Sequence, residues 1–181
     1  MIRFFPVLFL VLMAWLGIAS SAHAQTATPL SPKAAAQFQR EMRRHVGDVL
    51  PAGLMVKSRQ GQDVDLRDAL GSRTILFKLD PECEPCLEFM DFLRKHRPKD
   101  DQVTIVVLMV KDTGTTIPDL PPQVIYLRTA LDMRSEGFLA GEYTPTTFYF
   151  DEASTLIKRE VGAPFSLENL LQFPTDIPAT P

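Results

Sequence analysis

Two short apolar runs on either side of a helical pattern constrain the fold of this chain more than any other feature. Thr74–Leu79 is a mostly apolar run that a turn at residues 80–82 ends, and residues 102–110 form a strongly apolar, β-branched segment. Between them, from Cys83 to about His96, apolar side chains recur at helical spacing. A strand, a helix and a strand in this order predict two parallel strands joined by a right-handed crossover.

Further elements are predicted on both sides of this unit. Before it we expect a helix from Lys33 to about Leu50, with Ser31 and Pro32 as its cap and first turn. A strand at 54–56, a hairpin turn at 59–62 and a short helical turn that ends at Gly71 should follow. After it we expect a strand at 124–127, a helix at 130–140 that ends at Gly141, strands at Thr146–Phe150 and Leu156–Val161 around a turn at 151–154, and a last helix from Ser166 to near Phe173. The pattern predicts an α/β fold with a mixed central sheet flanked by helices and an N-terminal helical extension.

The N-terminal segment has the order of a secretory signal peptide. Arg3 is followed by a mostly apolar stretch at 4–18, then by small residues that end in Ala22-His23-Ala24. The apolar stretch is shorter than the ~20 residues of a typical membrane-spanning helix, so we favour cleavage after Ala24 over an uncleaved membrane anchor. This predicts a periplasmic protein that contacts the membrane only through the N-terminal segment, and only if that segment is not cleaved.

The composition fits one soluble domain after the signal. The net charge is −3 and no long basic run follows residue 24, which argues against a nucleic-acid partner. We predict a signal peptide at 1–24, an N-terminal extension at 25–50, one domain at 51–173 and a disordered tail at 174–181.

The two cysteines of the chain, Cys83 and Cys86, are three residues apart where the predicted helix begins. A disulfide between them closes a very small loop and constrains the unfolded chain little, so redox chemistry explains the pair better than a structural staple. At a helix N-terminus the free N–H groups and the helix dipole stabilise a thiolate. We therefore predict that Cys83 attacks and that Cys86 resolves the mixed disulfide, with Glu84 and Pro85 forming the active-site loop between them.

Metal and haem sites fit the pattern less well. Zinc needs about four ligands, and the chain has neither a second cysteine pair nor a histidine at a suitable spacing. Covalent haem attachment needs a histidine directly after the second cysteine, where this chain has Leu87. We expect no metal site and no cofactor.

A second motif stands about 60 residues after the cysteines. Thr144-Pro145 lies at the mouth of the apolar strand that begins at Thr146. We predict a cis peptide bond before Pro145, which would turn the Thr144 backbone outward to pair with an extended substrate segment beside Cys83. A trans proline that simply starts a strand is the alternative.

Taken together, these motifs resemble those of the bacterial periplasmic thioredoxin-like proteins of the TlpA/ResA type. The resemblance covers residues 52–172 and includes the hairpin around Gly61, the Cys-Glu-Pro-Cys motif at the helix start, the Thr-Pro-Thr-Thr-Phe motif from Thr144 and the closing hairpin that ends at Gly162. It implies a thioredoxin fold and disulfide exchange in the periplasm, often as a reductase and in some members toward the thiols of apocytochrome c. This chain departs from the pattern because Glu82 stands where the family usually has Trp, and Phe77 stands where many thioredoxins bury an acidic residue.

Four acidic residues surround the cysteines: Asp80, Glu82, Glu84 and Glu88. Their charges oppose a thiolate, so they favour a reducing rather than a strongly oxidising protein. Our leading prediction is a disulfide reductase whose partners are disulfide-containing exported proteins and a thiol electron-donor protein. A disulfide oxidase or isomerase that uses the same residues, and a non-catalytic thioredoxin-fold module that binds a partner, stay open as alternatives.

Overall fold

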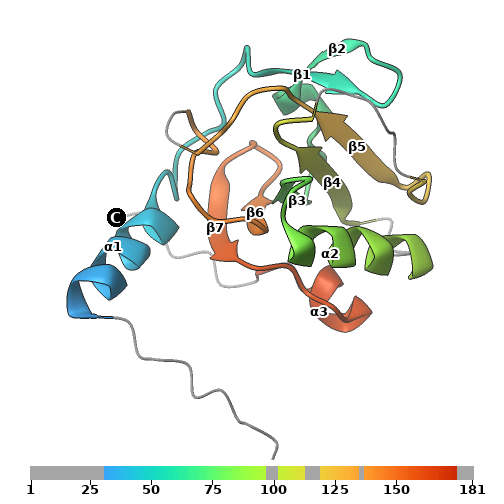
Figure 1. Cartoon of the computed structure of the whole chain (residues 1–181). Helices are drawn as coiled ribbons and strands as arrows, with labels where there is room; N and C mark the ends of the chain where they lie inside the picture. The colour runs from blue at the N-terminus through green and yellow to red at the C-terminus, as the bar shows by residue number, and fades with distance from the viewer. Residues whose placement is uncertain (1–30, 97–101, 113–118, 135–136, 175–181) are drawn as a thin grey trace, which may run out of the picture.

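The computed structural model describes residues 31–96, 102–112, 119–134 and 137–174 (Figure 1). The elements in chain order are α1 (Pro32–Arg43), β1 (Met55–Ser58), β2 (Asp63–Asp65), the 3-10 turn η1 (Leu66–Ala69), β3 (Thr74–Leu79), α2 (Glu84–Lys95), β4 (Thr104–Met109), β5 (Val124–Arg128), β6 (Thr146–Phe150), β7 (Leu156–Val161) and α3 (Leu167–Leu171). The predicted signal peptide and the tail from residue 175 lie outside the described residues. Within those residues, no helix has both the length and the apolar character needed to cross a bilayer.

The seven strands form one mixed sheet in the order β2-β1-β5-β4-β3-β6-β7. β4 takes the central position and pairs in parallel with β3 on one side and with β5 on the other. The outer pairs, β1 with β2, β1 with β5, β3 with β6 and β6 with β7, are antiparallel. The predicted mixed sheet and the parallel pair joined by α2 are confirmed.

Strand β3 is buried along its whole length and carries the chain into the cysteine pair. Its odd-numbered side chains, Ile75, Phe77 and Leu79, pack with α2, whereas Leu76 packs into a second apolar cluster on the opposite face. A strand covered on both faces reads as a continuous apolar run, which is why β3 was recognisable from the sequence. Lys78 interrupts that run and is nevertheless only 1% exposed.

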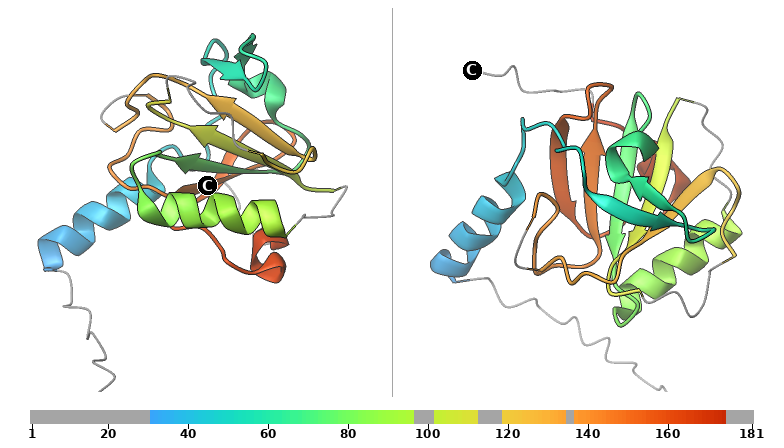
Figure 2. Two further views of the ribbon diagram at one scale, coloured as in Figure 1. Left: turned by 45° about the vertical axis from the view of Figure 1, so that its right-hand side comes forward. Right: turned by 90° about the horizontal axis from the view of Figure 1, so that it is seen from above.

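Helices α2 and α3 lie against the same face of the sheet (Figure 2). Phe89 and Leu93 of α2 and Leu170 of α3 are fully buried there. Helix α1 lies beside the edge strand β7.

The helix predicted at residues 130–140 is wrong over its described part, residues 130–134 and 137–140, which consist of turns and bends. Gly137 has a φ of 95°, a left-handed conformation that interrupts a right-handed helix. The carbonyl of Leu139 accepts a hydrogen bond from Lys78 and that of Met133 accepts one from the Gly141 N–H. Tertiary partners thus take the place of the helical ladder.

Helix α1 begins where the sequence predicts, because the Ser31 hydroxyl accepts a hydrogen bond from the Ala34 N–H at 3.2 Å. It ends at Arg43, before the predicted end near Leu50. His45, with a φ of 63°, and Gly47, with a φ of 94°, turn the chain out of the helix. The Gly47 N–H then donates to the Leu156 carbonyl and attaches this segment to β7.

Candidate active site

Cys83 and Cys86 form a disulfide at the start of α2. Cys83 is the N-cap residue, and its sulfur lies 3.3 Å from the Cys86 amide nitrogen, as the acceptor of that N–H. Cys83 is half-buried, whereas Cys86 is 0% exposed within the apolar cluster under α2. The accessible sulfur is thus the one that sits at the unpaired N–H groups of the helix end.

The segment before β6 lies directly beside the Cys83 sulfur. The Thr144-Pro145 peptide bond is cis, as predicted. The Thr144 carbonyl oxygen lies 3.5 Å from the Cys83 sulfur, which in the disulfide carries no proton to donate. Among the backbone bonds between described residues, none engages the Thr144 N–H. The structure therefore brings Cys83, Cys86, Thr144 and Pro145 together, and it places the other two predicted site residues, Glu84 and Pro85, in the first turn of α2 between the cysteines. The roles of all six stay predictions.

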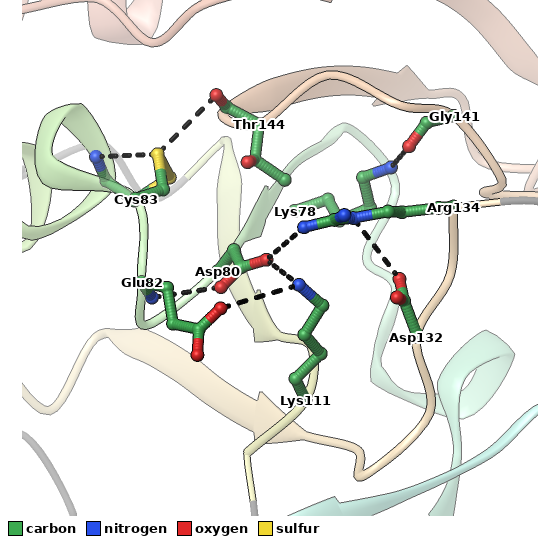
Figure 3. Close-up of polar contacts among 10 residues, drawn as sticks. Lys78, Asp80, Glu82, Cys83, Lys111, Asp132, Arg134, Gly141 and Thr144 are labelled. Atoms are coloured by element: carbon green, nitrogen blue, oxygen red, sulfur yellow. Dashed lines mark hydrogen bonds and ion pairs between the residues drawn. A yellow bond between two sulfur atoms is a disulfide. The ribbon is translucent and has the colours of Figure 1, made fainter.

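Asp80, three residues before Cys83, is buried and paired with cations (Figure 3). The Lys111 Nζ lies 2.7 Å from its Oδ2, the Arg134 Nη2 lies 3.7 Å from the same oxygen, and the Glu82 N–H donates to its Oδ1 at 2.9 Å. Burial raises the pKa of Asp80, but these hydrogen bonds and positive charges outweigh it and hold the pKa below its usual value. Its negative charge is thus compensated locally.

This pairing changes the electrostatic argument made from the sequence. Of the four acidic residues around the cysteines, Asp80 is neutralised by its partners, and Glu82 lies 3.9 Å from Lys111. Glu84 and Glu88 are exposed, where water and salt screen their charges. The loop is therefore less negative at the sulfur than the sequence alone indicates.

A buried cation supports the loop that carries Thr144. The Lys78 Nζ donates to the Gly141 carbonyl at 2.8 Å and to the Leu139 carbonyl at 3.3 Å. Burial, and then the positive charge of Arg159, lower the pKa of Lys78 to about 8. Lys78 lies on the face of β3 opposite α2 and ties β3 to residues 139–141.

Helix α1 reaches the same loop. One oxygen of Glu41, Oε1, accepts from the Glu142 N–H at 3.0 Å and lies 3.4 Å from Nη2 of the buried Arg159. The Tyr143 ring meets the Phe38 ring edge to face, with centroids 5.5 Å apart. A side chain at Gly141 would overlap the Arg159 guanidinium and the Glu41 carboxylate, so any larger residue there requires these two side chains to shift.

No group of three or more histidine, cysteine, aspartate or glutamate side chains is arranged to hold a metal ion in the part of the chain that the structure describes.

Comparisons with solved structures identify the architecture. The C-terminal domain of an uncharacterized Bacteroides fragilis protein matches 72% of this chain and 99% of its own length, with a TM-score of 0.56 at 13% identity. A candidate thiol:disulfide interchange protein DsbE from Chlorobium tepidum matches 68% of this chain and 91% of its own length, with a TM-score of 0.51 at 19% identity. A thioredoxin-like protein from Bacteroides caccae matches 77% of this chain and 53% of its own length, with a TM-score of 0.50 at 15% identity.

The chain has a thioredoxin-like fold. The predicted fold is thereby confirmed, and at these identities the likeness concerns the fold alone. Comparisons with family models and with curated protein sequences give no match.

Sequence reasoning missed the charged residues that surround the site. Lys111 lies in a segment to which the sequence pattern assigned no element, and Arg134 lies in the helix predicted at 130–140. Glu41 belongs to a helix with no assigned role. Lys78 did carry a signal, because a lysine inside an apolar strand predicts a buried charge that needs partners. Which partners it has depends on the tertiary fold.

Proposed function

We propose that this protein is a thiol–disulfide oxidoreductase that reduces disulfides of exported proteins through Cys83 and Cys86. The observation that carries the proposal is the disulfide at the N-terminus of α2, with the Cys83 sulfur 3.5 Å from the Thr144 carbonyl oxygen. A thioredoxin-like fold, a helix-capping sulfur and an adjacent unpaired backbone segment together supply the nucleophile and a place for the substrate chain.

In the reduced protein, the Cys83 thiolate attacks one sulfur of a substrate disulfide. A bond forms between Cys83 and that sulfur, and the other substrate sulfur leaves as a thiolate that takes a proton from water. Cys86, after losing its proton to solvent, attacks the Cys83 sulfur. The Cys83–Cys86 disulfide forms and the first substrate sulfur leaves, so two electrons pass from the protein to the substrate. A dithiol donor protein returns the pair to the reduced form by the reverse exchange.

The geometry supports these roles for the two cysteines. Only Cys83 is accessible, and the Cys86 N–H that points at its sulfur would stabilise a thiolate there. Cys86 is buried among apolar side chains, which shield its sulfur from other reagents while the mixed disulfide on Cys83 persists. An extended substrate segment can pair with the Thr144 backbone while its disulfide meets Cys83.

The compartment and the direction of electron flow belong to the same proposal. The N-terminal order of basic, apolar and small residues indicates export, and an oxidising compartment is where a reductase needs a dedicated donor. The name of the Chlorobium tepidum neighbour, a thiol:disulfide interchange protein, fits this activity. We expect a reduction potential well below the value of about −120 mV that marks strong periplasmic oxidants.

Insulin reduction tests the activity, with wild type compared with Cys83→Ala and Cys86→Ser. Wild type should turn over with a dithiol donor, Cys83→Ala should be inactive, and Cys86→Ser should accumulate a mixed disulfide. Equal activity in wild type and Cys83→Ala would reject the enzyme and favour a partner-binding module. A potential near that of the strong oxidants would instead reassign the same residues to an oxidase or isomerase. Identification of the protein trapped on Cys86→Ser then names the substrate.

A further inference from the structure

A groove lined largely by arginines runs between α1 and the loop that leads to Thr144. Arg40, Arg43 and Arg44 from the end of α1 form one wall, Arg134 forms part of the other, and Gly141 and Glu142 lie between them. The hollow measures about 650 Å³. We refer to it as the arginine groove.

The two walls are fixed to one another. Glu41, one residue after Arg40, accepts from the Glu142 N–H at 3.0 Å and pairs with Arg159, and Phe38 of α1 meets Tyr143. These contacts hold the end of α1 against the loop, so the groove is a built feature of the fold and does not depend on a chance approach of two surface side chains.

The charge of the groove is opposite to that of the whole chain, which is −3. Its lining holds four arginines and two glutamates. Arg159 engages the Glu41 carboxylate, and Arg134 lies 3.7 Å from Asp80 and 3.6 Å from Asp132. The uncompensated positive charge of the groove therefore comes from the arginines at the end of α1. Within the described residues, Arg40, Arg43 and Arg44 form no ion pair with a carboxylate. The dipole of α1 favours cations at its C-terminal end. Arg134, from a different segment, adds a fourth guanidinium to the same hollow.

The arginine groove adjoins the redox site at two points. Glu142 stands two residues before Thr144, whose carbonyl lies 3.5 Å from the Cys83 sulfur. Arg134 lies 3.7 Å from Asp80, and the Asp80 carbonyl accepts the Cys83 N–H at 3.1 Å. A substrate chain held at Thr144 therefore has the groove within a few residues, since an extended chain advances about 3.3 Å per residue.

We propose that the arginine groove binds an acidic segment that flanks the disulfide of the substrate polypeptide. Guanidinium groups bind carboxylates through paired hydrogen bonds, and several in one hollow favour a chain with more than one acidic residue. This inference rests on the proposed function and adds the substrate class: disulfides with acidic neighbours. The exposed Glu84 and Glu88 on the α2 side repel the same segment, which restricts it to one side of the disulfide.

Reduction kinetics of synthetic disulfide peptides test the inference with the full chain. The peptides share one disulfide loop and differ in flanks rich in glutamate, serine or lysine, placed before or after the loop. Wild type should prefer the glutamate flank on one side, and added salt should weaken that preference. The variant Arg40→Gln/Arg43→Gln/Arg44→Gln should lose about tenfold in kcat/KM for that peptide through KM, and less than about twofold for the serine peptide.

A control variant removes the same number of positive charges elsewhere. Arg67→Gln/Arg94→Gln/Lys95→Gln changes exposed residues of η1 and of the far end of α2, and should keep the wild-type preference. No preference in wild type, or an equal loss of kcat/KM for all peptides in the groove variant, would overturn the inference. So would groove-dependent binding to anionic phospholipid vesicles with unchanged peptide kinetics, since the groove would then serve a membrane surface.

Hydroxyethyl disulfide, a small uncharged substrate, separates this inference from the proposed function. If wild type reduces it and Cys83→Ala does not, the redox activity stands whatever the peptides show. If wild type reduces neither this compound nor any peptide, both the proposed function and the groove inference are wrong.

Discussion

Replacing Glu41 by alanine tests how α1 is tied to the active-site loop. The Arg159 side chain is 0% exposed, and that of Glu41 is 15% exposed. Two further nitrogens of Arg159, Nε and Nη1, have no hydrogen-bond partner among the described residues. Phe148 offers its ring face 5.1 Å from the guanidinium carbon. Glu41→Ala would therefore leave a buried cation whose remaining support is an aromatic ring.

The cost follows from the burial of the pair. Removing one partner of a buried ion pair typically costs about 3–5 kcal/mol, because the other charge stays buried without compensation. Glu41 sits at the edge of the pair and is partly accessible, so water can replace some of its effect and the lower value applies. We expect a loss of about 3 kcal/mol in the free energy of unfolding. For a domain of this size that corresponds to a fall in Tm of roughly 6–12 °C.

Thermal denaturation of the oxidised full chain, followed by circular dichroism, measures this loss. Glu152→Ala is the matched control, since Glu152 is an exposed glutamate of the β6–β7 turn and should leave Tm nearly unchanged. Glu41→Gln keeps an acceptor for the Glu142 N–H and should fall between wild type and Glu41→Ala. The double variant Glu41→Ala/Arg159→Met should recover part of the loss, because it removes the uncompensated charge. A Tm for Glu41→Ala equal to that of the control would refute the reasoning.

Three further predictions concern the same region. Burial lowers the pKa of Lys78 to about 8 from its ordinary 10.5, so between these pH values the unfolded chain binds more protons than the folded one. The free energy of unfolding should therefore rise across this pH window by on the order of 3 kcal/mol relative to Lys78→Met, as measured by urea titration. A difference between the two proteins that does not change with pH would contradict this. Asp80→Asn should leave the positive charges of Lys111 and Arg134 without their carboxylate partner, which increases the thiolate fraction of Cys83. The reduction potential, measured by glutathione titration, should rise by about 30 mV, whereas the control Glu152→Gln should leave it unchanged. Gly141→Ala should lower stability by about 1–3 kcal/mol in the same denaturation assay, and a stability equal to wild type would show that Arg159 and Glu41 can move aside.

The sequence was sufficient for the central unit of the fold because that unit is specified locally. Thr74–Leu79 matches β3 at both ends, and α2 begins at the cysteines, since a continuous apolar run and the turn at 80–82 leave few alternatives. The sequence also placed Thr144-Pro145 beside Cys83, because a proline at the mouth of an apolar strand accompanies a cysteine pair at a helix start. In these segments short-range pattern and tertiary structure agree.

The sequence failed where a long-range partner decides the local structure. The apolar residues of segment 130–140 have helical spacing. In the structure, however, the Leu139 carbonyl accepts a hydrogen bond from Lys78, and Gly137 adopts a left-handed backbone conformation. Asp80 counted as a free negative charge in the sequence, whereas Lys111 and Arg134 neutralise it in the fold. No periodicity encodes such pairings, because the partners come from distant segments that meet only after the sheet forms.

The position of α1 shows what this means for the organisation of the protein. A boundary at residue 51 is a natural prediction from the proline and glycine that follow α1, and it would assign the helix to an extension. Yet Glu41 provides the carboxylate for Arg159 of β7 and the acceptor for the Glu142 N–H, and Glu142 precedes Thr144 by two residues. Lys78 holds the same loop from β3. The segment beside the Cys83 sulfur is therefore held by one buried cation of the sheet directly and by another through α1, which makes the helix a structural part of the candidate site.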